Sequence, residues 1–317
     1  MLTVPLRSYW PQLLPSISKA ESGGIKQWLL EAKNYSIHSD ITDTKFEIQT
    51  YHADLFLRPI TFDINRLICA SVESASTKST TLLSPKSNSW NLIHLYYSAF
   101  FAANTILRIF GHSLTFLDRQ ICSSITKTAA LYGHKNNANL KKGLYLLDYQ
   151  TANSVLTGTR RSNSNGGSHE SAWKVFIQFI RKVQVDISTE YGLVYADELA
   201  KLRELELNLT NSGSTEGNWL STFRNEINYS HLHGVWFPYQ NYALKKRLEN
   251  SMSDWLQKPM DIDLRTSDSS LVMKFQATCM LIVSWAITLS TDMSNRPGAN
   301  GSFHKTGIVR IMNLLRE

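Results

Sequence analysis

Polar side chains that could act on a phosphate group are concentrated in residues 219–236, WLSTFRNEINYSHLHGVW. In a regular α-helix, with about 100° and about 1.5 Å of rise per residue, Arg224 and His231 lie on one face, roughly 10.5 Å apart along the axis. Asn228 falls near the same face, whereas His233 points the other way. A guanidinium, an amide and an imidazole on one stripe suit a site that binds a phosphate and transfers a proton.

The same residues also have a purely structural interpretation. They could form a polar, solvated helix face that ends at Gly234, because short patterns of this kind also occur by chance. If the helix ends before Gly234, it is less certain that the side chains share one helix face. His233 then competes with His231 as the residue that transfers a proton. The choice between these interpretations depends on the elements around the stretch.

Residues 89–111, SWNLIHLYYSAFFAANTILRIFG, predict the central helix of a bundle. They begin with a serine that could cap a helix, end with a glycine that could stop it, and are apolar at almost every position between. His94, Tyr97 and Ser98 interrupt the apolar run and could help to shape a site. For His94, packing in the core is the favoured role.

The remaining pattern indicates a mainly α-helical protein with a mixed N-terminal extension. We divide it into an extension (residues 1–85) that could contain short strands, a helical bundle (86–292), and a C-terminal loop with a short helix (293–317). Partial alternation up to a proline favours strands or an irregular cover at 45–62, and Ser/Thr-rich residues 71–86 predict a linker. Further helices are expected at residues 24–34, 115–132, 139–156, 171–191, 197–209, 243–256, 271–290 and 307–315.

The composition indicates a folded chain with a substantial core, since 43% of the residues are hydrophobic and 19% are charged. The net charge of +7 would help to attract a polyanion, but no basic run is long enough to form a nucleic-acid tail. Arg160 and Arg161 lie in a stretch, residues 157–170, that predicts a flexible polar loop. These two arginines either contact RNA phosphates or belong to an ordinary solvated loop.

Cys69, Cys122 and Cys279 have no metal-ligand spacing, so we expect reduced packing residues, no metal and no cofactor. Residues 271–290 are long enough to span a membrane, but Lys274 and other polar residues favour a buried bundle helix. The N-terminus lacks the apolar run of a signal peptide. We therefore expect a cytoplasmic protein without a membrane partner.

The order of these elements resembles the HEPN superfamily, which comprises compact α-helical domains of ribonuclease toxins, antiviral defence proteins and CRISPR-associated nucleases. Residues 90–110, WNLIHLYYSAFFAANTILRIF, are similar to the first helix of that family. Residues 224–231, RNEINYSH, match its R-x(4–6)-H motif with the longest permitted gap, and Asn225 fits the polar residue that commonly follows the arginine. The resemblance covers about residues 89–292.

The resemblance implies a metal-independent endoribonuclease, in which the ribose 2′-hydroxyl attacks the adjacent phosphorus and leaves a 2′,3′-cyclic phosphate. His231 would transfer protons, because an imidazole titrates near neutral pH. Arg224 would stabilise the negative charge of the transition state, and Asn225 would orient the phosphate or hold Arg224. Asn228 and Tyr229 are additional candidates for binding the substrate.

The resemblance also implies partners. HEPN ribonucleases typically pair two motif helices across one cleft, so a chain with one motif is expected to form a homodimer with a composite active site that acts on RNA. The biological role would be that of a toxin or an antiphage abortive-infection effector, with an antitoxin or another defence protein as a possible partner. The alternative is a non-catalytic HEPN-like module that binds RNA or protein, or has a regulatory role.

Overall fold

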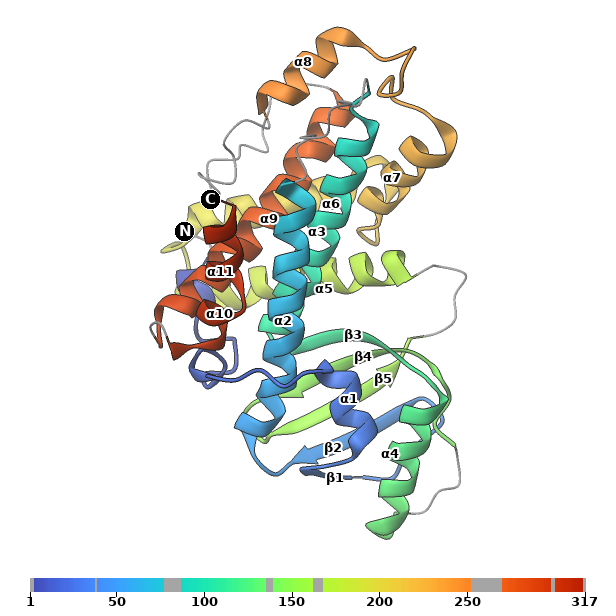
Figure 1. Ribbon diagram of the computed structural model, residues 1–317, viewed down its shortest axis with the longest axis vertical. Helices are drawn as coiled ribbons and strands as arrows, with labels where there is room; N and C mark the ends of the chain where they lie inside the picture. The colour runs from blue at the N-terminus through green and yellow to red at the C-terminus, as the bar shows by residue number, and fades with distance from the viewer. Residues whose placement is uncertain are drawn as a thin grey trace.

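The computed structural model describes residues 3–37, 39–76, 87–134, 139–161, 168–251, 270–297 and 300–315. The protein is mainly α-helical and contains a five-stranded antiparallel sheet. Figure 1 shows the sheet at one end of the molecule and most of the helices at the other. The mainly α-helical fold class is thus confirmed, but the expectation that residues 89–292 are entirely helical is wrong, because three of the strands lie in this region.

The sheet combines strands from distant parts of the chain. Its order is β1-β2-β5-β4-β3, and all neighbours are antiparallel. Phe46 faces Gly158 across the pair β2–β5, and a Cβ atom at Gly158 would lie only 2.2 Å from the Phe46 ring. Glycine is therefore required where this ring crosses the neighbouring strand. The strands are β1 (Tyr35–Ile37), β2 (Lys45–Thr50), β3 (His112–Leu117), β4 (Gly143–Gln150) and β5 (Val155–Arg160).

The helix predicted for residues 139–156 is wrong. Tyr145, Leu147 and Tyr149 of β4 are buried and alternate with half-buried residues, which is the two-residue period of a strand with one face in the core. Two other predicted segments are also partly strands. Residues 112–117 form β3 before helix α4 (Arg119–Leu131), and the predicted loop 157–170 begins with the last four residues of β5.

The centre of the molecule is helix α3 (Ser89–Ile109), as predicted. It packs against α2 (Ala53–Ser76), α9 (Leu271–Asn295), α5 (Ser168–Tyr191) and α7 (Trp219–Ser230). Helix α9 has the length and mean hydropathy, 1.5, of a membrane span, and 72% of its apolar window is buried inside the protein. The prediction of a buried bundle helix for residues 271–290 agrees with this packing.

Helix α2 replaces much of the strand and linker structure expected near the N-terminus. It runs through Pro59, because apolar residues at helical spacing are buried on both sides of the proline. Residues 71–76 of the predicted linker belong to this helix, and residues 77–86 lie outside the described chain. Helix α2 packs on α3, and β2 pairs with β5. The domain boundary predicted at residue 85 therefore falls between elements that are in contact with one another.

Among the remaining helices, those predicted at 24–34, 197–209 and 307–315 agree with the structure to within a few residues, and the short helix at 302–305 was not predicted. The helix predicted at 243–256 is found as far as residue 251, and residues 252–256 lie outside the described chain. The C-terminal pair packs against α2, where the Asn65 side-chain amide donates to the Ser302 hydroxyl at 2.9 Å. These helices are α1 (Gly24–Glu31), α6 (Ala196–Leu209), α8 (Tyr242–Ser251), α10 (Ser302–Lys305) and α11 (Ile308–Leu314).

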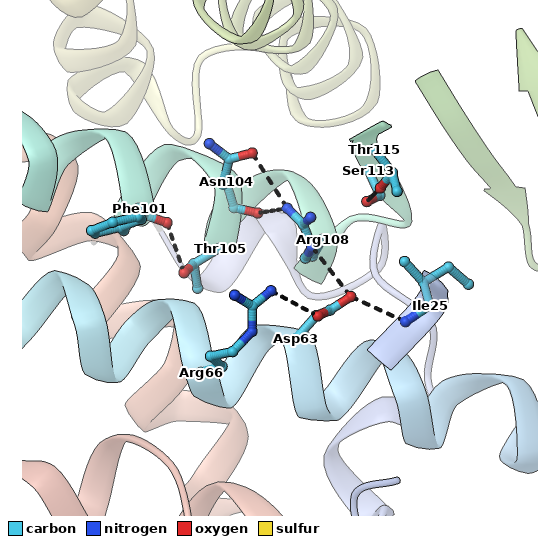
Figure 2. Close-up of polar contacts among 9 residues, drawn as sticks. All are labelled: Ile25, Asp63, Arg66, Phe101, Asn104, Thr105, Arg108, Ser113 and Thr115. Carbon is cyan, nitrogen blue, oxygen red and sulfur yellow. Dashed lines mark hydrogen bonds and ion pairs between the residues drawn. The ribbon is translucent and has the colours of Figure 1, made fainter. Parts of the chain in front are cut away.

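A buried ion pair connects the helices with the sheet end of the molecule. Figure 2 shows Asp63 of α2 facing Arg108 of α3, with the start of α1 on the other side of the carboxylate. The Asp63 carboxylate accepts a hydrogen bond from the Ile25 backbone N–H at 3.2 Å and lies 3.9 Å from Nε of Arg108. It therefore caps α1 from a different helix, at the end where the helix dipole favours negative charge.

Candidate functional site

Arg224 lies inside the protein although it was predicted on a polar stripe. Leu220 and Ile227, one turn before and after it, are completely buried against the core, so the stripe that carries Arg224 is the apolar face of α7. Only 8% of Arg224 is exposed. Its guanidinium carbon lies 5.0 Å from the ring centre of Tyr96 and 5.7 Å from that of Tyr97, so the positive charge faces two aromatic rings of α3.

This buried cation has no acidic partner in the described part of the chain. No ion pair joins it to a carboxylate there, and its Nε has no hydrogen-bond partner. Arginine is seldom buried without such a partner, because removing the charge from water is costly. The surroundings of Arg224 therefore carry a net positive charge that an anion such as a phosphate could neutralise.

The Tyr96 hydroxyl connects Arg224 with helix α5. It accepts a hydrogen bond from Nε1 of Trp173 at 3.1 Å and lies 3.1 Å from Nδ1 of His169. Burial raises the pKa of Tyr96, whereas its contacts with Trp173, Ser221 and Arg224 act in the opposite direction. The phenol therefore stays protonated, and it shares a hydrogen bond with Nδ1 of His169 whose donor is set by the tautomer of the imidazole.

His169 is the imidazole nearest to this cluster, and nothing in the sequence singled it out. Its ring lies 4.1 Å from that of Phe100, measured between centres. Burial, and to a lesser degree the positive charge of Arg224, lowers the pKa of His169. The lowered pKa favours the neutral imidazole at pH 7.

His231 lies in a different environment. Helix α7 ends at Ser230, and His231 adopts a left-handed conformation with φ of 51° as the C-terminal cap. Its side chain is exposed, with the ring 4.9 Å from that of Trp236. Arg224 thus lies in the core, whereas His231 lies at the surface and outside the helix, so the prediction that both share one helix face does not extend to His231.

The other residues of the motif are more exposed or have structural partners. His233 bonds through Nε2 to the Glu226 carboxylate at 2.8 Å and stacks on Phe223, so it stabilises the end of α7. Asn225 and Tyr229 are exposed, and Asn228 is half-buried. Asn228 lies one turn after Arg224 on nearly the same face, but no contact joins any of these three side chains to Arg224 in the described chain.

Arg160 and Arg161 are not brought to this cluster. Arg160 ends β5 and Arg161 follows it, so both lie at the sheet, away from α7 (Figure 1). Their backbone N–H groups bond to the carbonyls of Thr44 and Leu144, at 2.7 and 2.8 Å. The flexible loop expected around them is therefore ordered sheet structure up to residue 161, and residues 162–167 lie outside the described chain.

The cluster combines residues that sequence patterns indicated with residues that they missed. Tyr97 was a candidate, as a polar break in an apolar helix, whereas Tyr96 looked like an ordinary core aromatic. Trp173 followed the apolar pattern of α5, and His169 stood in a segment expected to be a loop. Only the packing of α3, α5 and α7 brings these side chains to Arg224.

No group of three or more possible metal ligands occurs among the residues that the structure describes, and the three cysteines are free. Comparisons with family models, curated proteins and solved structures found no match for this chain.

Proposed function

We propose that this protein is a metal-independent endoribonuclease, in which Arg224 and His231 of two chains form a composite site. The observation that carries the proposal is the buried guanidinium of Arg224, which has no carboxylate partner in the described chain and belongs to the helix that ends just before the exposed imidazole of His231. The resemblance of residues 90–110 and 224–231 to HEPN ribonucleases supports the same assignment. The proposed role is that of a toxin or an antiphage effector.

The chemistry follows from these side chains. The His231 imidazole of one chain accepts the proton of the ribose 2′-hydroxyl, and the 2′-oxygen bonds to phosphorus. The bond from phosphorus to the 5′-oxygen breaks, and the protonated imidazole of the second chain donates to the leaving oxygen. Arg224 stabilises the negative charge that develops on the non-bridging phosphate oxygens, and Asn225 holds the phosphate. The products are a 2′,3′-cyclic phosphate and a 5′-hydroxyl.

A cleavage assay with total RNA in excess EDTA tests the proposal. We expect wild-type protein to cleave RNA, and His231→Ala to lower the rate by about 10²-fold or more, the usual contribution of a general acid or base. His233→Ala is the matched control, since His233 bonds to Glu226 at the end of the same helix. Equal rates for wild type and His231→Ala would remove His231 from the mechanism.

A non-catalytic module that binds RNA or protein is the second candidate. The exposed apolar and aromatic side chains around the end of α7 favour it, because such groups often mark interaction surfaces. They are Tyr229, Leu232, Phe237 and Tyr239. If this candidate is correct, RNA stays intact in EDTA and with added Mg²⁺, and substitution of Tyr229 and Tyr239 by Ser weakens binding of a partner while Arg224→Met leaves it unchanged.

A further inference from the structure

A second basic region lies at the sheet, away from the Arg224 cluster. An open pocket of about 1070 Å³ is formed where β3 and β5 end and β4 begins. Its volume is at the upper end of the range for small-molecule sites. The lining residues that bear on its chemistry are Asp43, Phe116, Arg119, Lys141, Lys142 and Arg160.

The charges in this pocket do not balance. Lys141 pairs with the Asp43 carboxylate at 2.8 Å, and this contact lowers the pKa of Asp43. Arg119, Lys142 and Arg160 have no ion pair with a carboxylate among the described residues. Three cations therefore remain available on the wall of one pocket, a charge that suits a ligand with several negative charges.

Arg160 is held in place against the sheet. It ends β5, and a Cβ atom at Gly143 of β4 would lie 2.6 Å from its Nε. The absence of a side chain at Gly143 thus leaves the space that the guanidinium occupies. The Nε atom is buried and has no hydrogen-bond partner in the described chain. Because Nε is buried, a ligand in the pocket would contact the half-buried Arg160 side chain through its other two nitrogens.

An exposed aromatic ring lies at the same end of the sheet, on the face opposite to the Arg160 side chain. Phe116, on β3, is 50% exposed and lines the same pocket. Aromatic rings next to arginine and lysine are the combination with which proteins hold nucleotides, because the ring stacks on the base and the cations contact the phosphates. An aliphatic anion would bind to the cations but would not stack on the ring.

We infer that this pocket binds a nucleoside phosphate through Arg119, Lys142 and Arg160, with the base stacked on Phe116. The nucleoside phosphate is either a free nucleotide or a unit of an RNA strand, since both present a base and phosphates. The pocket shares no residue with the Arg224 cluster, so the inference stands independently of the proposed ribonuclease activity.

Titration calorimetry with the full chain tests the inference, using ATP, inorganic tripolyphosphate and a short single-stranded RNA as probes. We expect the double variant Arg119→Glu/Lys142→Glu to lose at least about tenfold in affinity for every probe that binds, since charged hydrogen bonds contribute this much or more. Lys127→Glu is the matched control, because Lys127 is an exposed cation on the same helix as Arg119 but does not line the pocket.

The role of the ring is tested separately. Phe116→Ser should weaken binding of ATP by about tenfold and leave tripolyphosphate unchanged, because only the nucleotide has a base to stack. Binding of ATP identifies a free nucleotide as the occupant, whereas binding of RNA alone identifies a strand. The inference is overturned if wild-type protein binds no probe, or if Lys127→Glu lowers the affinity as much as the double variant.

Discussion

Arg224 is the residue at which stability and function are expected to conflict. Its charge is buried against Tyr96 and Tyr97, without an acidic partner in the described chain. Moving an unpaired charge from water into the protein interior destabilises the folded state by several kcal/mol, whereas cation–π contacts stabilise it by only about 0.5–2 kcal/mol. A residue retained at such a cost is best explained by its role in a site.

We therefore expect Arg224→Met to fold at least as stably as wild type and not to cleave RNA. Methionine keeps most of the volume of arginine and removes the desolvated charge. Urea unfolding of both proteins, together with the RNA assay in EDTA, gives the two measurements. Loss of more than about 2 kcal/mol of unfolding free energy would identify Arg224 as a structural residue.

His169 predicts a pH dependence of stability. Its pKa in the folded protein is lowered by burial and by Arg224, so below about pH 6.5 the unfolded chain binds this proton more readily than the folded chain. The contribution of His169 to stability is therefore present at neutral pH and is lost as the pH falls through 6.5 towards the lowered pKa.

The variant His169→Phe keeps a ring against Phe100 and cannot be protonated. We expect it to lose less stability than wild type between pH 7 and pH 5, in parallel urea titrations. Because all other titrating groups are common to both proteins, the difference between the two pH profiles isolates His169. An identical loss in both proteins would mean that His169 does not titrate differently on folding.

At the scale of elements, the start of α1 depends on a carboxylate supplied by α2. Gly24 has φ of +64°, and a Cβ atom there would lie 2.4 Å from Oδ1 of Asp63. An alanine at this position would have to displace Asp63 from the Ile25 N–H and from Arg108. Since Arg108 is buried as well, any displacement leaves two charges imperfectly paired.

We therefore expect Gly24→Ala to lower the unfolding free energy by several kcal/mol, through backbone strain and disruption of the buried pair. Gly192→Ala is the control, because Gly192 has a similar φ of +58° but no atom within 4 Å of the added Cβ. It should cost only the strain, about 1–2 kcal/mol. Equal losses, measured by urea unfolding, would show that the contact with Asp63 has no energetic effect.

At the scale of the whole molecule, the helices and the sheet share one hydrophobic core. It extends from Phe46 and Tyr149 of the sheet to Phe275 and Trp285 of α9. A continuous core of this kind favours cooperative unfolding of both parts. The candidate site lies where α3, α5 and α7 meet, and the basic pocket is lined by residues at the ends of the strands. Figure 1 shows that α7 and the sheet are at different ends of the molecule.

The proposed composite site requires two chains, because one α7 supplies one Arg224 and one His231. We predict a homodimer in solution. Light scattering across a range of protein concentrations checks this, with a mass of twice that of one chain as the expected result. A monomer at all concentrations at which RNA is cleaved would exclude the two-chain mechanism while leaving the activity itself in place.

The sequence by itself determined three of the long helices. Residues 171–191 were predicted from apolar residues at helical spacing, and residues 89–111 and 271–290 from apolar runs that are too long for a strand. Strand β4 was missed because its run of leucine and tyrosine, GLYLLDYQ, is compatible with a buried helix until a sheet is present to pair with it. Helix α2 was missed because Pro59 normally ends a helix, and the packing against α3 outweighs that preference.

The candidate site also combines features that the sequence predicts with features that only the tertiary structure decides. Sequence spacing predicted that Arg224 and His231 share one face of a helix, but α7 ends at Ser230 and His231 has a left-handed conformation, so the helical spacing does not extend to it. Only the tertiary structure decided that Arg224 is buried and His231 is exposed, since burial depends on which helices pack against α7. Tyr96 lies against both Arg224 and His169 and so connects α3, α7 and α5, which are distant in sequence. No local sequence pattern predicts these contacts.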